Sequence, residues 1–453
     1  ADLFRGFQIE NNNTFREHLN RYDVLFLNIQ QFLSRAGIHD MTEYLQRAVM
    51  KELRETYGGL FSPETTVLAE ALEEIYAKTK KQFIFLIDEW DCVMREKQEA
   101  EEQQRNYLDF LRNLLKDQPY VALAYMTGIL PIKKYGSHSA LNMFFEYSMT
   151  DQKELEEYTG FTEDEVRELC CRFDMDFQET GSWYDGYMFK RFLHIYNPRS
   201  VVEAMRCQAF SGYWISTETY EALKIYMDMD FDGLRQDMTQ ILGGGRVRVN
   251  TRSFQNDMHT FKTKDDVLTL LIHLGYLAYD VDTREAYVPN EEVRIAFARA
   301  VRDTDWEPVI QAIRDSDRLL KATWDKDEEL VAEYIDKVHR ENTSILQYNN
   351  ENALSCVVTL AYYNAVNEYM LIREMPSGKG YADMVFLPRK YSAKPAMVVE
   401  LKYGKPARSA IAQIKERQYP EALKDFRGKI LLVGISYDKD KRYSCLIEEW
   451  VKE

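Results

Sequence analysis

Apolar runs alternate with helical patterns in the first third of the chain. Apolar residues recur at helical spacing over about 41–55 and 65–80. Three short apolar runs indicate buried strands: "DVLFLNI" at 23–29, "QFIFLIDEWD" at 82–91 and "YVALAYMTG" at 120–128. Strands that alternate with helices favour a parallel sheet covered on both faces. The pattern therefore predicts an α/β core domain over residues 1–150.

The middle of the chain is mostly helical and acidic from about 151 to 240. The stretch "LLIHLGYLAYD" (270–280), followed by "AYVPNEEV" (286–293), is typical of a helix packed on a small hairpin, as in winged-helix modules. Two polar helices then extend to about residue 340. We expect a helical lid and a winged-helix-like region over residues 151–340.

The last 113 residues have the pattern of a separate α/β domain, which we place at 341–453. A helix is predicted over about 351–369 and another from about Pro406, where proline suits a first turn. Strands are predicted at 370–375, 381–387, 396–402 and in "KILLVGISYD" (429–438). The predicted order is α-β-β-β-α-β.

Charge supports this division of the chain. The whole sequence has a net charge of −16, yet residues 341–453 hold 17 Lys+Arg against 14 Asp+Glu, a net of +3. This is compatible with a phosphate-backbone ligand but does not demand one. The sequence contains no apolar run of about 18 residues, so we expect no membrane span. Six cysteines without a C-x-x-C pair suggest reduced thiols in a cytoplasmic protein, and the seven histidines lack zinc-ligand spacing.

Acidic residues interrupt two of the C-terminal strands in "YADMVFLPRKYSAKPAMVVELKYG" (381–404). Side chains alternate across a strand, so Glu400 and Lys402 share one face, and Asp383 can meet them if the two strands are neighbours. Two close carboxylates repel unless a cation lies between them, and oxygen ligands suit Mg²⁺ or Mn²⁺. A lysine beside the metal can hold a phosphate, which predicts a phosphodiester-cleaving site. The alternative is a strand end with solvated charges.

The arrangement D-x16-E-x-K resembles the PD-(D/E)XK nuclease superfamily, whose core has the same order of elements. "GYADMVF" resembles the first motif of that superfamily, without the proline often found before the aspartate. The resemblance implies a divalent metal held by Glu351, Asp383 and Glu400. It implies nucleic acid as the partner, DNA more than RNA, and a catalytic set of Asp383, Glu400, Lys402, Gln413 and Tyr419. Some members of the superfamily have lost catalysis.

The strand before Asp88 and Glu89 resembles the Walker B strand of P-loop ATPases, in which the Asp holds the Mg²⁺ shell and the Glu activates water. Thr127 then corresponds to the polar tip that senses the γ-phosphate. The alternative is a strand that ends in acidic surface residues. Further segments extend the resemblance to the AAA-ATPase-like family of bacterial proteins that carry a C-terminal PD-(D/E)XK domain: "GFTEDEVREL", "WYDGYMF", "IYNPRSVVEAM" and "YWISTETY". The resemblance implies nucleotide-binding roles for Asp88, Glu89 and Thr127.

The phosphate-binding motif G-x-x-x-x-G-K-[ST] is absent from the sequence: no Gly-Lys pair is followed by Ser or Thr. In the family this motif lies shortly upstream of the segment that matches "LFRGFQIE", so we expect that the chain starts after it. The 453 residues are then not expected to bind ATP well, whereas a longer protein would. We interpret "WYDGYMF", around Asp185, as a packed turn in the lid and assign it no chemistry.

Two functions follow from these patterns. The first is a metal-dependent nuclease whose access to nucleic acid is regulated by the ATPase-like region. The second is a non-catalytic scaffold that binds nucleic acid or protein through a degenerate nuclease fold. A pure ATPase would need the missing motif.

Overall fold

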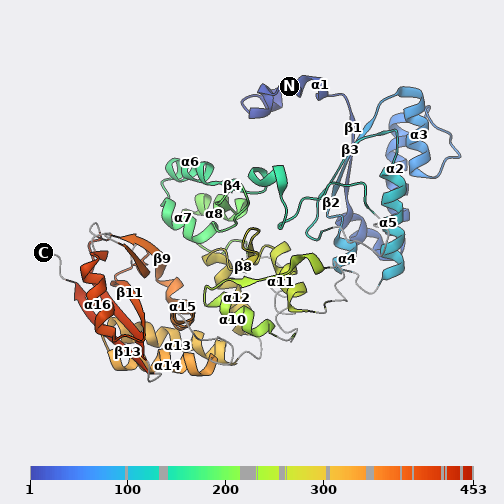
Figure 1. Cartoon of the computed structure of the whole chain (residues 1–453). Coiled ribbons are helices and arrows are strands. Elements are labelled where there is room, and N and C mark those ends of the chain that lie inside the picture. The colour runs from blue at the N-terminus through green and yellow to red at the C-terminus, as the bar shows by residue number, and fades with distance from the viewer. Residues whose placement is uncertain are drawn as a thin grey trace. The chain divides into compact units, whose positions relative to one another are not determined.

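The chain divides into two units in the computed structural model, Ala1–Ser148 with Phe254–Phe261, and Met149–Ser253 with Lys262–Glu453 (Figure 1). The structure describes residues 2–96, 100–131, 141–214, 231, 233–254, 261, 263–302, 307–342, 351–377, 380–389, 392–419, 423, 426–438 and 442–450. All six cysteines are free in the structure. The domain limits 150 and 340 stay predictions.

The first unit is built on the parallel sheet that the sequence predicts. Its strands are β1 (Asp23–Asn28), β2 (Phe83–Asp88) and β3 (Val121–Met126), in the order β1-β2-β3. The connecting helices are α2 (Ile29–Tyr57), α3 (Leu68–Thr79), α4 (Cys92–Glu96) and α5 (Glu101–Leu115). Figure 1 shows α2, α3 and α5 together on one side of the strands. Alternate residues of β2 are buried in the core that these helices share.

The other face of this sheet differs from the prediction of two covered faces. The strand register aligns Val24 with Ile84 and Leu123, and it aligns Phe26 with Leu86 and Tyr125. The residues of the two outer strands in these rows are between 53 % and 61 % exposed. Within the described part of the first unit, helices therefore cover one face of the sheet only. Apolar side chains on the other face are exposed, although their composition is typical of strands covered on both faces.

The second unit begins with the helical lid. Its helices are α6 (Glu163–Phe173), α7 (Phe177–Tyr184) and α8 (Pro198–Cys207), beside a small sheet of β4 (Phe161–Thr162) and β5 (Ile195–Tyr196). The α6 start is fixed by a capping box in which Thr162 and Glu165 satisfy each other's backbone N–H groups. At α8, the side chain of Asn197 accepts the Ser200 N–H and Pro198 occupies the first turn. Trp183 and Tyr184 of α7 pack in the lid core.

A winged-helix-like region follows, and its helix and hairpin are confirmed. Helix α11 (Lys264–His273) precedes β7 (Ala278–Asp280) and β8 (Glu285–Tyr287), and β6 (Val247–Arg248) pairs with the outer side of β8. Helices α10 (Leu234–Leu242) and α12 (Glu291–Arg302) flank these strands in the sequence. Helix α12 follows the hairpin directly and contacts α7 of the lid.

The two predicted polar helices are present, and each has one apolar stripe. Helices α13 (Glu307–Trp324) and α14 (Glu328–Asn342) pack on each other and on α15 (Glu351–Ala361). Ile313 of α13 and Val331 and Ile335 of α14 are fully buried. Because their few apolar residues lie on one stripe, helices of polar composition still bury one face.

The C-terminal sheet has five strands in the order β13-β12-β11-β10-β9. They are β9 (Tyr369–Ser377), β10 (Gly380–Pro388), β11 (Ala396–Tyr403), β12 (Ile430–Tyr437) and β13 (Tyr443–Trp450). Only the β11–β12 pair is parallel among the described strands of this sheet. The α-β-β-β-α-β order is confirmed, and β13, whose polar and apolar residues are mixed, is an addition that the sequence did not indicate. Together the two sheets and their helices confirm the mixed α/β fold, and the C-terminal sheet is consistent with the restriction-endonuclease-like fold that the nuclease resemblance implies.

Helix α16 (Ala407–Glu416) packs against β11, β12 and β13. Its apolar side chains Ala407, Ala410, Ile411 and Ile414 are buried, as the predicted stripe required. The close approach depends on Gly434 of β12, because a Cβ atom there would meet the carbonyl oxygen of Ala407 at 2.7 Å. This packing places the helix beside the end of β11 that carries Glu400 and Lys402.

Gly186, in the middle of the segment "WYDGYMF" and two residues after α7, adopts a backbone conformation that is strained for other residue types. Its φ is +111°, and a Cβ atom there would overlap the carbonyl oxygen of Pro289. We expect Gly186→Ala to destabilise the second unit by about 3 kcal/mol or more, because strain and overlap add. Urea unfolding measures the change. The matched control is Gly181→Ala in α7, where the nearest atom to the new Cβ is 3.6 Å away, so stability should hold or rise. Equal effects of the two substitutions would contradict the prediction.

Candidate functional site

The C-terminal acidic residues lie at the paired ends of β10 and β11. The two strands are antiparallel, with Met384 opposite Val399, so Asp383 and Glu400 follow one step further along the pair. The backbone N–H of Leu401 donates to Asp383 Oδ2 at 2.7 Å. Asp383 is thereby tied to the backbone immediately after Glu400.

Glu400 is the centre of a hydrogen-bonded cluster, although it is only 1 % exposed. Its Oε1 accepts from Lys402 Nζ at 2.8 Å and also from Gln413 Nε2. Gln413 lies on α16, and its Nε2 is 3.3 Å from the hydroxyl of Tyr419. The structure therefore gathers the five residues that the sequence nominated for catalysis, from β10, β11, α16 and the segment after it. Their catalytic roles stay predictions.

The surroundings of Glu400 disfavour its charged form. Burial, and after it the nearby charge of Asp383, raise the pKa of Glu400 to about 7, while the Lys402 amine works in the opposite direction. Its second oxygen, Oε2, is buried and has no hydrogen-bond partner within the described part of the chain. A buried acceptor without a donor is costly, so the arrangement is suited to a further ligand.

The residues present fit a divalent cation. Asp383 and Glu400 supply carboxylate oxygens, and the unpartnered Oε2 of Glu400 is an oxygen that a cation would satisfy. The third proposed ligand, Glu351, is the first residue of α15, but its side chain lies outside the described residues. Among the side chains that are described, no group of three or more His, Cys, Asp or Glu residues is placed to hold a metal. The described donor set therefore consists of the two carboxylates.

In the first unit, the polar ends of neighbouring strands meet. Thr127 Oγ1 donates to Asp88 Oδ1 at 2.6 Å. Asn28, which sequence reasoning missed, contributes Nδ2 at 3.4 Å from Asp88 Oδ2, while its own Oδ1 caps α2. The available signal was its place as the polar end of the apolar run "DVLFLN". Three neighbouring strand ends thus converge on Asp88.

The two acidic residues after Asp88 are occupied by contacts within the unit. Glu89, in a left-handed conformation with φ +54°, forms an ion pair with Arg95. Asp91 is completely buried and accepts from the backbone N–H of Leu130 at 2.8 Å and from Arg95 Nε at 3.0 Å. Asp91 therefore joins the ends of β2 and β3, a structural role that the sequence did not distinguish from the other acidic residues.

No helix in the described part of the chain combines the length and the apolar character that crossing a membrane requires.

Family models match both ends of the chain. A family described as "Predicted AAA-ATPase" matches residues 1–137, and the PD-(D/E)XK nuclease superfamily matches residues 349–447. The second range includes Asp383, Glu400, Lys402, Gln413 and Tyr419.

A similar protein is the "Uncharacterized protein in vnfD 5'region" of Azotobacter chroococcum mcd 1. It is 26 % identical over 156 residues, which cover 33 % of this chain and 30 % of that protein. The chain therefore matches less than a third of the length of this relative. No solved structure matches the chain. On the family matches, this chain carries an AAA-ATPase-like domain at residues 1–137 and a PD-(D/E)XK nuclease superfamily domain at residues 349–447.

Proposed function

We propose that the C-terminal domain hydrolyses phosphodiester bonds of nucleic acid, DNA more than RNA, with Mg²⁺ or Mn²⁺ as its cofactor. The observation that carries this proposal is the cluster of Asp383, Glu400 and Lys402 at one end of the β10–β11 pair, with a buried Glu400 oxygen that lacks a partner. The nuclease superfamily match over the same residues supports it.

Each residue of the cluster has a role in this proposal. Asp383 and Glu400 would hold the cation, which supplies polarisation of the scissile phosphate and activation of the attacking water. Lys402, the only amine bonded to Glu400 among the described residues, would turn to the phosphate oxygens and stabilise their developing negative charge.

Gln413 and Tyr419 act as positioning residues in the proposal. Gln413 donates to Glu400 from α16, and the Tyr419 hydroxyl lies beside the Gln413 amide. Tyr419 is 2 % exposed, so packing fixes its ring and the chain of contacts fixes the Glu400 carboxylate. A rigid carboxylate retains the geometry that in-line attack at phosphorus requires.

We further propose that the ATPase-like domain regulates this activity. Asp88, Glu89 and Thr127 would serve nucleotide binding in a protein that also contains the G-x-x-x-x-G-K-[ST] motif. The meeting of Asp88 with Thr127 and Asn28 supports a polar site at the ends of the parallel strands. The ion pair of Glu89 with Arg95 would have to open before Glu89 could act on water.

Cleavage assays test the proposal. The purified chain is incubated with plasmid DNA, single-stranded DNA and RNA, in Mg²⁺, in Mn²⁺ or in EDTA. We expect cleavage of at least one substrate with a metal and none in EDTA, because two carboxylates and an amine provide no strong nucleophile by themselves. Added ATP is expected to leave the rate unchanged, since the sequence lacks the phosphate-binding motif.

The alternative function is a non-catalytic scaffold that binds nucleic acid or protein. Lack of cleavage on every substrate with either metal, in a preparation that binds the nucleic acid, would favour this alternative.

A further inference from the structure

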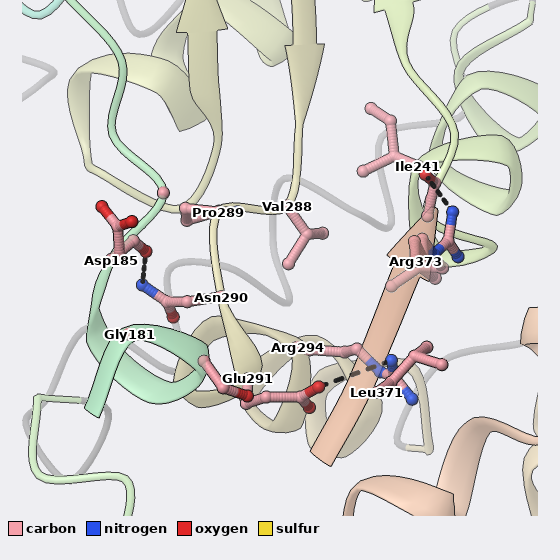
Figure 2. Close-up of a pocket in the computed structure, with 14 residues that line it drawn as sticks. Gly181, Asp185, Ile241, Val288, Pro289, Asn290, Glu291, Arg294, Leu371 and Arg373 are labelled. Carbon is pink, nitrogen blue, oxygen red and sulfur yellow. Dashed lines mark hydrogen bonds and ion pairs between the residues drawn. The ribbon is translucent and has the colours of Figure 1, made fainter. Parts of the chain in front are cut away.

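A cavity of about 330 Å³ lies within the second unit, where the lid and the winged-helix-like region meet the first strand of the C-terminal sheet. Its walls come from α7, the end of α10 with its following glycines, the segment from β8 into α12, and β9. Figure 2 shows these residues around the cavity, with Asp185 and Arg373 on different sides of it. The volume falls in the range of small-molecule sites, about 300–1,000 Å³.

One wall of the cavity carries an ion pair whose charged atoms are too far apart to form a hydrogen bond. Glu291 and Arg294, one turn apart on α12, are both more than nine-tenths buried, yet the shortest distance between Glu291 Oε1 and Arg294 Nη1 is 3.9 Å. Figure 2 draws the two side chains pointing toward one another. A charged hydrogen bond between nitrogen and oxygen is normally about 2.7–2.9 Å long. The pair therefore leaves hydrogen-bonding capacity unused.

That unused capacity is one acceptor and one donor. Glu291 Oε2 and Arg294 Nε are buried and have no hydrogen-bond partner within the described residues. The Arg294 guanidinium cannot simply move to Glu291, because its Nη2 donates to the Tyr363 carbonyl at 2.8 Å and the group lies 4.7 Å from the Tyr363 ring centre. Buried polar atoms without partners cost about 1–3 kcal/mol each, which favours a ligand that supplies both partners.

The rest of the cavity limits the chemistry of that ligand. Val288, Pro289 and Leu371 give it apolar walls, and the two acidic and two basic lining residues balance in formal charge. Arg373 is held away from the pair by the carbonyl oxygens of Gly243 and Gly244 at 2.9 and 2.8 Å. Of the four charged lining residues only Glu291 and Arg294 are buried, and a charged ligand would unbalance this neutral pair. A neutral, planar molecule with a donor and an acceptor side by side on one edge suits this cavity. Its polar edge would bond to Glu291 and Arg294, and its flat faces would contact the apolar walls.

We propose that this cavity binds a nucleobase, with its hydrogen-bonding edge on Glu291 and Arg294 and its ring between the apolar walls. Every nucleobase carries a donor next to an acceptor on its Watson–Crick edge, and proteins read extruded bases in this way. The base could belong to a free nucleoside or to a polynucleotide. The proposal does not rest on the nuclease function, because binding needs no metal.

Equilibrium dialysis of the full chain in EDTA, with labelled adenosine, guanosine, cytidine and uridine, tests the proposal. We expect at least one nucleoside to bind with a dissociation constant of about 1 mM or tighter. Ser182→Trp, which adds an indole to the α7 wall, is expected to weaken binding at least tenfold. Ser34→Trp, at an exposed position on α2 of the first unit, is the matched control and should leave binding unchanged.

A second variant and a competitor complete the test. Glu291→Gln keeps the size of the side chain and should weaken binding or change which base binds best, so the test does not depend on the folding of Ser182→Trp. Displacement of the nucleoside by a single-stranded oligonucleotide points to a polynucleotide base, and failure to displace it points to a free nucleoside. No nucleoside or oligonucleotide binding at millimolar concentration, or binding that ignores both variants, overturns the proposal.

Discussion

Glu400→Gln is expected to reduce metal-dependent cleavage by roughly 10²–10³-fold while the protein stays folded. The substitution keeps the shape of the side chain but removes the charge that a cation requires. It also relieves a buried carboxylate whose pKa is raised to about 7, so folding should not suffer. Initial rates at saturating Mg²⁺ or Mn²⁺, with circular dichroism of both proteins, measure the two effects.

The matched control is Glu416→Gln, at an exposed position of the same helix that carries Gln413. Its cleavage rate should equal that of the unchanged protein. If Glu400→Gln cleaved as fast as this control, Glu400 would not hold the cation, and the proposed site would be wrong even if the protein were a nuclease.

The stability of the metal-free protein is expected to fall as the pH rises from about 4.5 to about 7. The pKa of Glu400 is about 7 in the folded chain, against an ordinary value of 4.5. Between these values the unfolded chain has released the proton that the folded chain still holds, so rising pH favours unfolding. The contribution is present below pH 4.5 and lost through pH 7, with a size on the order of 3 kcal/mol. Thermal unfolding in EDTA at several pH values measures it.

Glu400→Gln isolates this contribution because glutamine does not titrate. The difference between the unfolding midpoints of the unchanged protein and the variant should therefore shift across this pH range by several degrees. Mg²⁺ or Mn²⁺ should raise the midpoint of the unchanged protein at pH 8 and have little effect at pH 5, because protons compete for the same carboxylate. A midpoint difference that does not vary with pH would show that Glu400 titrates normally.

The sequence alone determined the local parts of the candidate site. Strand alternation placed Glu400 and Lys402 on one face, and the structure joins them at 2.8 Å. The prediction worked because strand and helix periods are set within a few residues. The same periodicity gave the elements of the C-terminal domain, apart from β13, an edge strand of mixed polarity that contacts both α14 and α16. Gln413 came only from the resemblance to the nuclease superfamily, and the structure places its amide against Glu400.

The tertiary structure alone decided which distant residues meet. The β10–β11 register brought Asp383 to the Leu401 N–H, and packing covered one stripe of α13 and α14 while leaving a face of the parallel sheet exposed. The open pair of Glu291 and Arg294 came to line a cavity with Asp185 and Arg373, which lie more than 70 residues away on either side. Such contacts depend on how whole elements pack. The local periodicity of a sequence indicates which face of an element is buried, but it does not indicate which distant residue a side chain contacts.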